Sequence, residues 1–329
     1  MNAFSTLAYT VLRNRVYFLL ALTTVVTVAM SLLSPYFFTT SNLLGMTRFG
    51  AVLALVALGE TLVILAGGGG IDLSVGAMVS LTGVIIGLLA QDHLNVVFAC
   101  LLGVLAGAGL GAINGLLVTG IGLPPLIATL GTWYVYGAVA LVLTNGQPIS
   151  SFPGWFGHLG QGDVLGVPAQ VLFIVLPVYL VLQFIVSKTI FGREIYLIGG
   201  NALAAQLSGI RVGRTRFLLY TLSGLLAGLG GIIMCSWLLT ARPDVGTGLE
   251  LQAITVAVLG GTDIFGGAGT LGGSMTAVLI VTMVYSGLQL ANVNSVWQLG
   301  VLGGLLLVAV GINQAIASLA LRRRRSAAT

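Results

Sequence analysis

The chain has 329 residues, of which 57% are hydrophobic and only 6% are charged, and its mean hydropathy is +1.08. Soluble domains carry about 25% charged residues, so 13 basic and 8 acidic side chains cannot cover the surface of a soluble protein of this size. The composition therefore excludes a soluble enzyme, a nucleic-acid-binding protein and a disordered chain. It predicts an all-α, polytopic membrane protein in which residues 1–329 form a single transmembrane domain.

Apolar segments follow one another along the chain, and a helical crossing of a bilayer needs about 20 such residues. The first segment follows Arg13 and Arg15; it is long for a signal peptide and no small-residue cleavage site comes after it. We expect about ten transmembrane helices, some short or broken by glycine, at residues 16–33, 50–66, 74–90, 96–118, 124–144, 166–187, 216–240, 250–262, 270–290 and 296–317.

The basic residues predict the orientation of these helices. Ten alternating crossings with the N-terminus inside place eleven of the 13 basic residues in the cytoplasm, which agrees with the positive-inside tendency. Both termini are then cytoplasmic, residues 188–215 form the one long cytoplasmic loop, and residues 145–165 form an outer loop, folded as a short interfacial helix or a cap. The exceptions are Arg48 and Arg242.

Neither metal nor nucleotide chemistry is expected from the residues present. Cys100 and Cys235 lie inside apolar runs and are interpreted as free, packed thiols, and the chain has only two histidines. A phosphate-binding loop needs a Gly-Lys-Ser/Thr ending, which is missing. We therefore expect no metal, no cofactor and no catalytic site.

Small residues and breaks carry the first structural signals. Glycines at 103, 107, 111 and 115 repeat on one helix face, and Gly224 and Gly228 do so later, which favours close helix packing within the chain over a subunit interface. Gly69, Gly70, Asp72 and Ser74 belong to a glycine-rich break between two apolar segments, and Gly260, Gly261 and Asp263 belong to a second one. Paired breaks indicate a translocation pathway, or else tight cytoplasmic turns with an Asp capping the next helix.

Glu60 lies near the middle of the second apolar segment, where a carboxylate is costly and is a functional candidate by default. The alternative is a neutral carboxyl group that is hydrogen-bonded to a polar neighbour. Polar side chains that could line a pathway with Glu60 are Asn114, Thr129, Thr132, Tyr134 and Asn145.

Several long motifs, in order from about residue 40 to 315, resemble the permease subunits of bacterial sugar ABC importers. This group includes the ribose, xylose, arabinose and galactose permeases and extends to rhamnose and autoinducer-2. The motifs are Gly69-Gly70-Ile71-Asp72-Leu73-Ser74-Val75-Gly76, residues 125–132, Phe191-Gly192-Arg193, Gly199-Gly200-Asn201-Ala202, Ala204-Ala205, Ser208-Gly209-Ile210, residues 246–251 and residues 258–262. The family usually has two glycines before Ile-Asp, whereas this chain has four.

The resemblance implies a non-enzymatic inner-membrane permease that pairs with a second copy or a sister permease. Its further partners would be cytoplasmic ATPase subunits and a periplasmic sugar-binding protein, besides membrane lipid. We expect the ATPase to dock on a short helix capped by Asn201 and ended by Ser208 and Gly209; the alternative is that the basic residues around it only meet anionic lipid. The coupling residues implied are Gly199, Asn201, Ala204, Ala205, Ser208, Gly209 and Arg211.

Two functions remain in competition, and the motifs do not fix the solute. The first is the permease subunit of an importer for a monosaccharide or a related sugar-like solute. The second is a secondary transporter driven by an ion gradient, with Glu60 and Asp72 as coupling groups; such carriers usually need more intramembrane charges than this chain has. A membrane-embedded enzyme would need a nucleophile–base or metal constellation, which the sequence lacks.

Overall fold

The computed structural model of the chain describes the backbone of residues 15–326, and the side chains of residues 16–294 and 296–311. Arg13 lies outside the described residues, as do the side chains of Arg15 and of Arg322 to Arg325. The described α-helices are α2 (Arg15–Leu33), α3 (Thr40–Leu65), α4 (Val75–Gln91), α5 (Val96–Thr119), α6 (Pro125–Thr144), α7 (Gly157–Gln161), α8 (Leu176–Lys188), α9 (Ile190–Gly200), α10 (Ala202–Leu207), α11 (Val212–Leu238), α12 (Leu249–Leu259), α13 (Leu271–Leu290) and α14 (Ser295–Ser326). A π-helical turn, η2 (Val171–Val175), leads into α8.

Ten of these helices lie at the ten apolar segments, which confirms the all-α, polytopic prediction. Seven are long and apolar enough to cross a membrane, and the shorter apolar helices are Val75–Gln91, Leu249–Leu259 and Val296–Gly311. Two differences are large: α14 ends at Ser326 rather than near residue 317, and α3 begins at Thr40 rather than near residue 50. The helix continues through Arg48 because the guanidinium donates to the carbonyl of Gln161, so this charge has a partner inside the protein.

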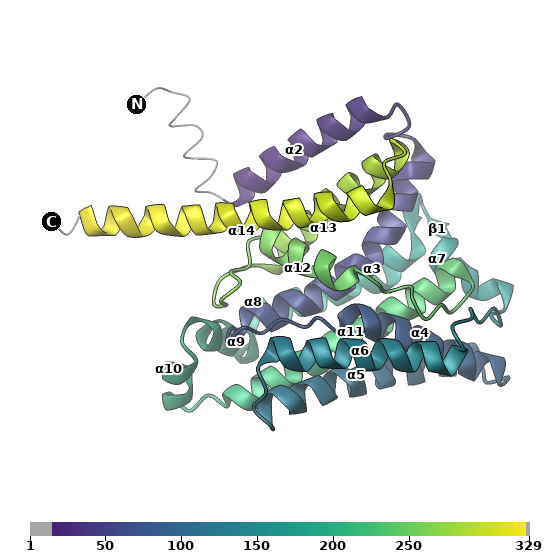
Figure 1. Cartoon of the computed structure of the whole chain (residues 1–329), viewed down its shortest axis with the longest axis horizontal. Helices are drawn as coiled ribbons and strands as arrows, with labels where there is room; N and C mark the ends of the chain where they lie inside the picture. Colours follow the sequence, from purple (N-terminus) through teal and green to yellow (C-terminus); the bar gives the residue numbers. More distant parts are fainter. Residues whose placement is uncertain (1–14, 327–329) are drawn as a thin grey trace.

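Helix α3 is the central helix of the molecule. It packs against α11, α12 and α13, and nearly all of it from Gly50 to Leu65 is buried. Figure 1 shows α3 between a layer of α4, α5, α6 and α11 and a layer of α2, α13 and α14. A buried helix that is apolar on all sides is typical of the interior of a membrane bundle.

Glycines let α5 and α11 approach closely. A Cβ atom at Gly111 would lie 2.2 Å from the carbonyl oxygen of Tyr220, and one at Gly107 would lie 2.5 Å from that of Gly224. Gly228 meets α5 in the same way. The predicted packing within the chain is confirmed, because the glycine face of α5 packs against the glycine face of α11.

The loop between α6 and α8 folds over one end of α11. It contains η1 (Gly154–Phe156), α7 and a hairpin of β1 (Asp163–Val164) and β2 (Val167–Pro168). The N–H of Gly160 donates to Ser236 Oγ at 2.8 Å, and Ile149 pairs with Ala241 through two backbone hydrogen bonds. The loop is thus a folded cap, one of the two forms expected for it.

Candidate functional site

A buried polar cluster lies at the first break, residues 66–74, between α3 and α4. The backbone N–H of Asp72 donates to both oxygens of the Glu60 carboxylate, at 3.2 and 3.3 Å. Both side chains are fully buried. The chain thus turns back alongside α3, and Glu60 fixes the place to which it returns.

The carboxylate of Asp72 accepts hydrogen bonds from two helices, α5 and α11, and from its own turn. Its Oδ1 accepts from Ser74 N at 3.1 Å, Ser74 Oγ at 2.7 Å and Asn114 Nδ2 at 3.3 Å, and its Oδ2 accepts from Ser223 Oγ at 3.3 Å. Ser74 directly precedes α4, so the carboxylate lies beside the N–H groups at the start of that helix, where negative charge is favoured. Asp72 therefore ties α4, α5 and α11 to one point.

The cluster continues onto α6. Thr129 Oγ1 lies 3.1 Å from the carbonyl of Ile71, and Tyr136 Oη lies 3.4 Å from Asn114 Oδ1. Polar groups in a membrane interior are stable only when they are hydrogen-bonded to one another. The arrangement holds a non-helical segment in shape inside an apolar bundle.

The second break, residues 260–270 between α12 and α13, differs from the first. Asp263 is exposed, and its Oδ1 accepts from the N–H of Phe265 at 2.9 Å within a tight turn. The interpretation of the second break as a turn whose Asp caps the next helix is wrong on the cap, because Thr270 caps α13. The two breaks match in their glycines but not in the environment of their carboxylates.

Three glycine-containing segments meet backbone to backbone where the two breaks approach each other. Gly267 N donates to the carbonyl of Leu65 at 2.9 Å, which joins the second break to the end of α3. A Cβ at Gly199, near the end of α9, would lie 2.0 Å from that same oxygen and 2.3 Å from Gly267 N. A Cβ at Gly266 would lie 2.4 Å from the Cα of Gly67. We call these segments, 65–67, 199–200 and 266–267, the glycine junction.

The cytoplasmic loop predicted at 188–215 contains α9 and α10. The predicted short helix is present as α10, because Asn201 Oδ1 accepts from Ala204 N at 3.0 Å and Gly209 ends the helix with φ of +86°. Ala205 is buried against the rest of this chain, so its side chain is not available to a docking partner, contrary to the expectation. Leu203 and Leu207 are exposed instead, at 66% and 82%.

The remaining candidates separate into two groups. Gly69, Gly260 and Gly261 lie in the breaks, and a Cβ at Gly260 would lie 2.5 Å from Ser274 N. Thr132 is buried but bonds only to the carbonyl of Thr129 in its own helix. Tyr134 and Asn145 are exposed and belong to no cluster.

Among the described residues, no group of three or more His, Cys, Asp or Glu is placed to hold a metal ion.

Three participants were not found from the sequence: Ser223, Tyr136 and Arg216. A polar residue within an apolar helix was the signal available for Ser223, and it lies beside Gly224, which was singled out. Arg216 entered the prediction only as one of the eleven cytoplasmic basic residues, yet its Nη2 lies 3.2 Å from the carbonyl of Ala66, at the end of α3.

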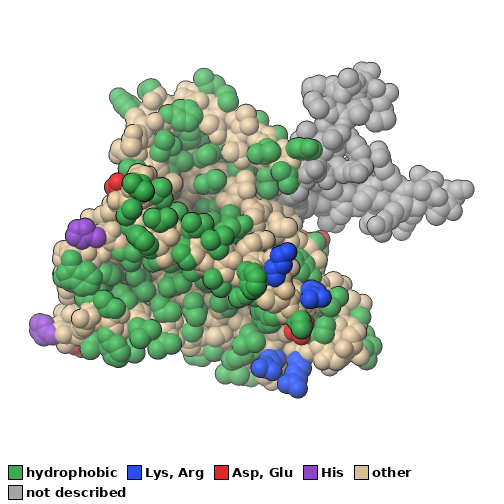
Figure 2. Space-filling view, turned by 180° about the vertical axis from the view of Figure 1, so that it is seen from behind, with side chains coloured by type: hydrophobic (Ala, Val, Ile, Leu, Met, Phe, Trp, Pro, Cys, Tyr) green, Lys and Arg blue, Asp and Glu red, His purple; other side chains and the backbone are tan. Residues whose placement is uncertain are grey.

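Basic side chains gather at the end of the molecule that carries α9 and α10. Lys188, Arg193, Arg211 and Arg214 are exposed there, and Figure 2 shows the blue side chains at one end and the histidines at the other. Figure 1 shows the C-terminal end of α14 at that same end. Between the two ends, this view shows many apolar side chains and few charged ones.

Comparison with known proteins identifies relatives over most of the chain. Residues 42–310 match the family described as the permease component of branched-chain amino acid transport systems. The chain is 41% identical to the ribose import permease protein RbsC of Bacillus subtilis over 288 residues, which covers 87% of this chain and 88% of the relative. No solved structure matches the chain.

Two Escherichia coli proteins are similar to the chain at comparable coverage. The D-allose transport system permease protein AlsC is 36% identical over 301 residues, or 91% of each chain. The probable ABC transporter permease protein YphD is 37% identical over 299 residues, or 90% of this chain and 88% of the relative.

Proposed function

Because the chain belongs to the permease-component family of branched-chain amino acid transport systems, we propose that it is the transmembrane permease subunit of an ABC importer. The transported solute is a monosaccharide or a related small sugar-like compound. Two relatives named for ribose and for allose, at 41% and 36% identity, support a sugar over the amino acids in the family's description. The membrane is the bacterial inner membrane, with both termini in the cytoplasm.

The observation that carries the proposal is the link between the polar cluster and the glycine junction. The Asp72 cluster shapes the first break within the bundle. The junction joins that break to the second break and to α9, which leads directly into α10. A force applied to α9 and α10 therefore reaches both breaks through rigid backbone contacts, which is the arrangement that an externally driven transporter needs.

A cytoplasmic ATPase subunit supplies the drive in this proposal, since the chain carries no nucleotide-binding motif. The ATPase contacts the outer face of α10 through Leu203 and Leu207, with Arg211 beside them. The shape of α10 is set by Gly199, Asn201, Ala204, Ser208 and Gly209. Ala205 packs the helix against the rest of this chain. The exposed basic residues of the same end also meet anionic lipid headgroups.

The cap formed by residues 145–170 lies on the outer side in this orientation, where a periplasmic binding protein delivers the solute. The translocation pathway is shaped by five side chains, which bind neither nucleotide nor metal: Glu60, Asp72, Ser74, Asn114 and Thr129. The permease works with a second copy of itself or with a sister permease.

Uptake by the reconstituted complex tests the function. Proteoliposomes holding the permease, its ATPase and trapped ATP, supplied with the binding protein, are expected to accumulate radiolabelled ribose or allose and not leucine. Uptake should need ATP and continue in the presence of an ionophore. Uptake that requires an ion gradient and ignores ATP would contradict the proposal and favour a secondary transporter; accumulation of leucine alone would overturn the sugar assignment.

A further inference from the structure

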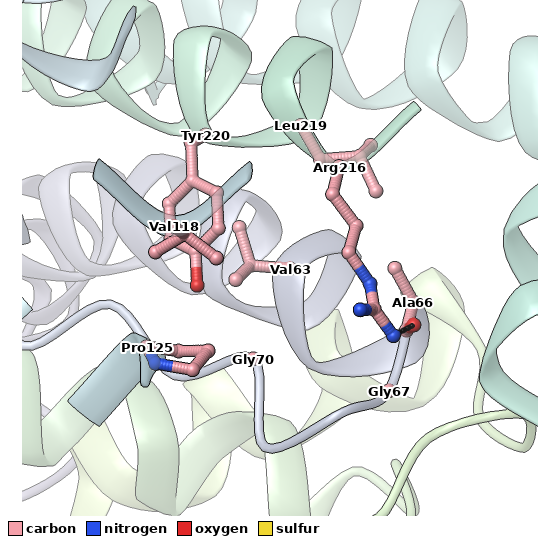
Figure 3. Close-up of a pocket in the computed structure, with 9 residues that line it drawn as sticks. All are labelled: Val63, Ala66, Gly67, Gly70, Val118, Pro125, Arg216, Leu219 and Tyr220. Atoms are coloured by element: carbon pink, nitrogen blue, oxygen red, sulfur yellow. Dashed lines mark hydrogen bonds between the residues drawn. The ribbon is translucent and has the colours of Figure 1, made fainter. Parts of the chain in front are cut away.

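Two side chains of α11, one helical turn apart, face the first break across a small cavity. Figure 3 shows Arg216 and Tyr220 projecting from α11 towards the turn that contains Gly67 and Gly70. The cavity between them measures about 10 Å³, roughly the space of one water molecule. Val118 of α5 and Pro125 of α6 close its far side.

Arg216 holds the end of α3 through a single hydrogen bond. Its Nη2 lies 3.2 Å from the carbonyl oxygen of Ala66, one of the carbonyls left without a helical partner at the end of α3. These carbonyls carry a partial negative charge, which favours a cation there. The guanidinium also lies over Gly68, where a Cβ would come within 2.5 Å of Nη2.

Two buried polar atoms of this pair have no partner among the described residues. Neither Arg216 Nε nor Tyr220 Oη has a hydrogen-bond partner among the described residues, and both atoms are buried. Nor does Arg216 form an ion pair with any described carboxylate. A partly buried cation that is held by one carbonyl, with an unpartnered hydroxyl one turn away, can exchange one partner for the other by a rotamer change.

Arg216 is also connected to the predicted cytoplasmic loop through the start of α11. It stands on the first turns of α11, directly after residues 199–211. The neighbouring Thr215 donates from Oγ1 to Glu194 Oε2 of α9 at 3.3 Å, so the start of α11 is fastened to α9. A rotation of α9 about its contact with Leu65 therefore moves Arg216 relative to the end of α3.

We propose that Arg216 is a positioning residue that ties the ATPase-docking loop to the first break, and that Tyr220 Oη is the alternative partner that receives it when the loop moves. The Ala66 contact keeps the break in the arrangement described above. When the Arg216 guanidinium leaves the Ala66 carbonyl for Tyr220 Oη, residues 66–70 lose this contact and can rearrange. The first break therefore rearranges only when the ATPase moves the loop. This inference rests on the proposed function and names a residue that couples ATP hydrolysis to the pathway.

The test measures the ATP hydrolysed per sugar imported by the reconstituted complex. Arg216→Gln should raise this ratio severalfold, because the break keeps only the glycine junction as its tie to the loop, while Arg216→Lys should restore part of the coupling by keeping the charge. Arg214→Gln is the matched control: it removes one positive charge from the same, exposed turn and should leave the ratio unchanged. Assembly with the ATPase is checked by size-exclusion chromatography.

Tyr220→Phe keeps the test decisive if Arg216→Gln does not assemble. It deletes a hydroxyl that has no partner here, so thermal stability should be unchanged or higher, whereas the coupling ratio should shift. A wild-type ratio in an assembled Arg216→Gln complex, or in Tyr220→Phe, overturns the inference. The proposed function fails separately, when the unmodified complex shows no ATP-driven uptake of sugar.

Discussion

The backbone N–H of Asp72 lies 3.2 and 3.3 Å from the two carboxylate oxygens of Glu60, inside the bundle. The intramembrane carboxylate therefore serves the shape of the first break, since it accepts a hydrogen bond from the segment that interrupts the helices. This hydrogen bond assigns Glu60 a structural role, and the Glu60→Gln variant tests whether Glu60 also carries protons.

Replacing Glu60 by glutamine should preserve transport. The amide oxygen of glutamine can still accept from Asp72 N, so uptake by Glu60→Gln should remain and should stay insensitive to an ionophore. Glu60→Ala leaves that N–H buried without a partner, at a cost of about 1–3 kcal/mol, and should reduce both thermal stability and uptake. Loss of all uptake in Glu60→Gln, with ionophore-sensitive uptake by the unmodified protein, would instead indicate ion coupling.

Asp72 should tolerate asparagine better than alanine. Asparagine keeps an oxygen for Ser74 and Asn114, whereas alanine removes the acceptor of four hydrogen bonds. Each donor left unpartnered in the interior costs about 1–3 kcal/mol, so Asp72→Ala should lower the melting temperature in detergent well below that of Asp72→Asn. Equal melting temperatures and wild-type uptake for both variants would contradict this role.

Asp263 supplies the comparison for Asp72, since it is an exposed residue in the other break. Asp263→Ala removes one hydrogen bond, to Phe265 N in a solvated turn, and surface changes are usually worth about 0.5 kcal/mol or less. We expect nearly normal melting and uptake. A loss as large as that of Asp72→Ala would show that the two carboxylates are equivalent after all.

The glycine junction can be tested with two adjacent glycines. A Cβ at Gly199 would lie 2.0 Å from the carbonyl oxygen of Leu65, whereas one at Gly200 would have no neighbour within 4 Å. Gly199→Ala should therefore displace α9 from both breaks, at a cost of about 1–3 kcal/mol, and impair uptake. Gly200→Ala should behave like the unmodified protein in melting and uptake assays.

The ATPase should be released by a charge on the exposed face of α10. Leu207→Glu places a carboxylate at an 82% exposed position, so the permease should fold normally but retain less ATPase in a pull-down. Leu165→Glu, at a fully exposed leucine of the β1–β2 hairpin, is the matched control and should retain all of it. Ala205→Glu should damage the permease itself, because Ala205 is buried. Full ATPase binding by Leu207→Glu would place the docking surface elsewhere.

The sequence alone was enough for the properties that depend on composition along the chain. Apolar length located the ten helices, because a bilayer sets the length of a crossing helix, and Asn201 and Gly209 located α10, because caps act within one turn. It did not determine which way a side chain faces. Helices that are apolar on every side carry no periodic signal for their inner face, and the six residues of α10 are too few to show one. The burial of Ala205 and the different surroundings of Asp72 and Asp263 were therefore not predicted. Only the tertiary structure decided that Glu60, Asp72, Asn114 and Ser223 converge, and that Arg216 reaches the end of α3. These contacts join residues up to 151 positions apart, and their approach depends on how α3, α5 and α11 pack around the first break.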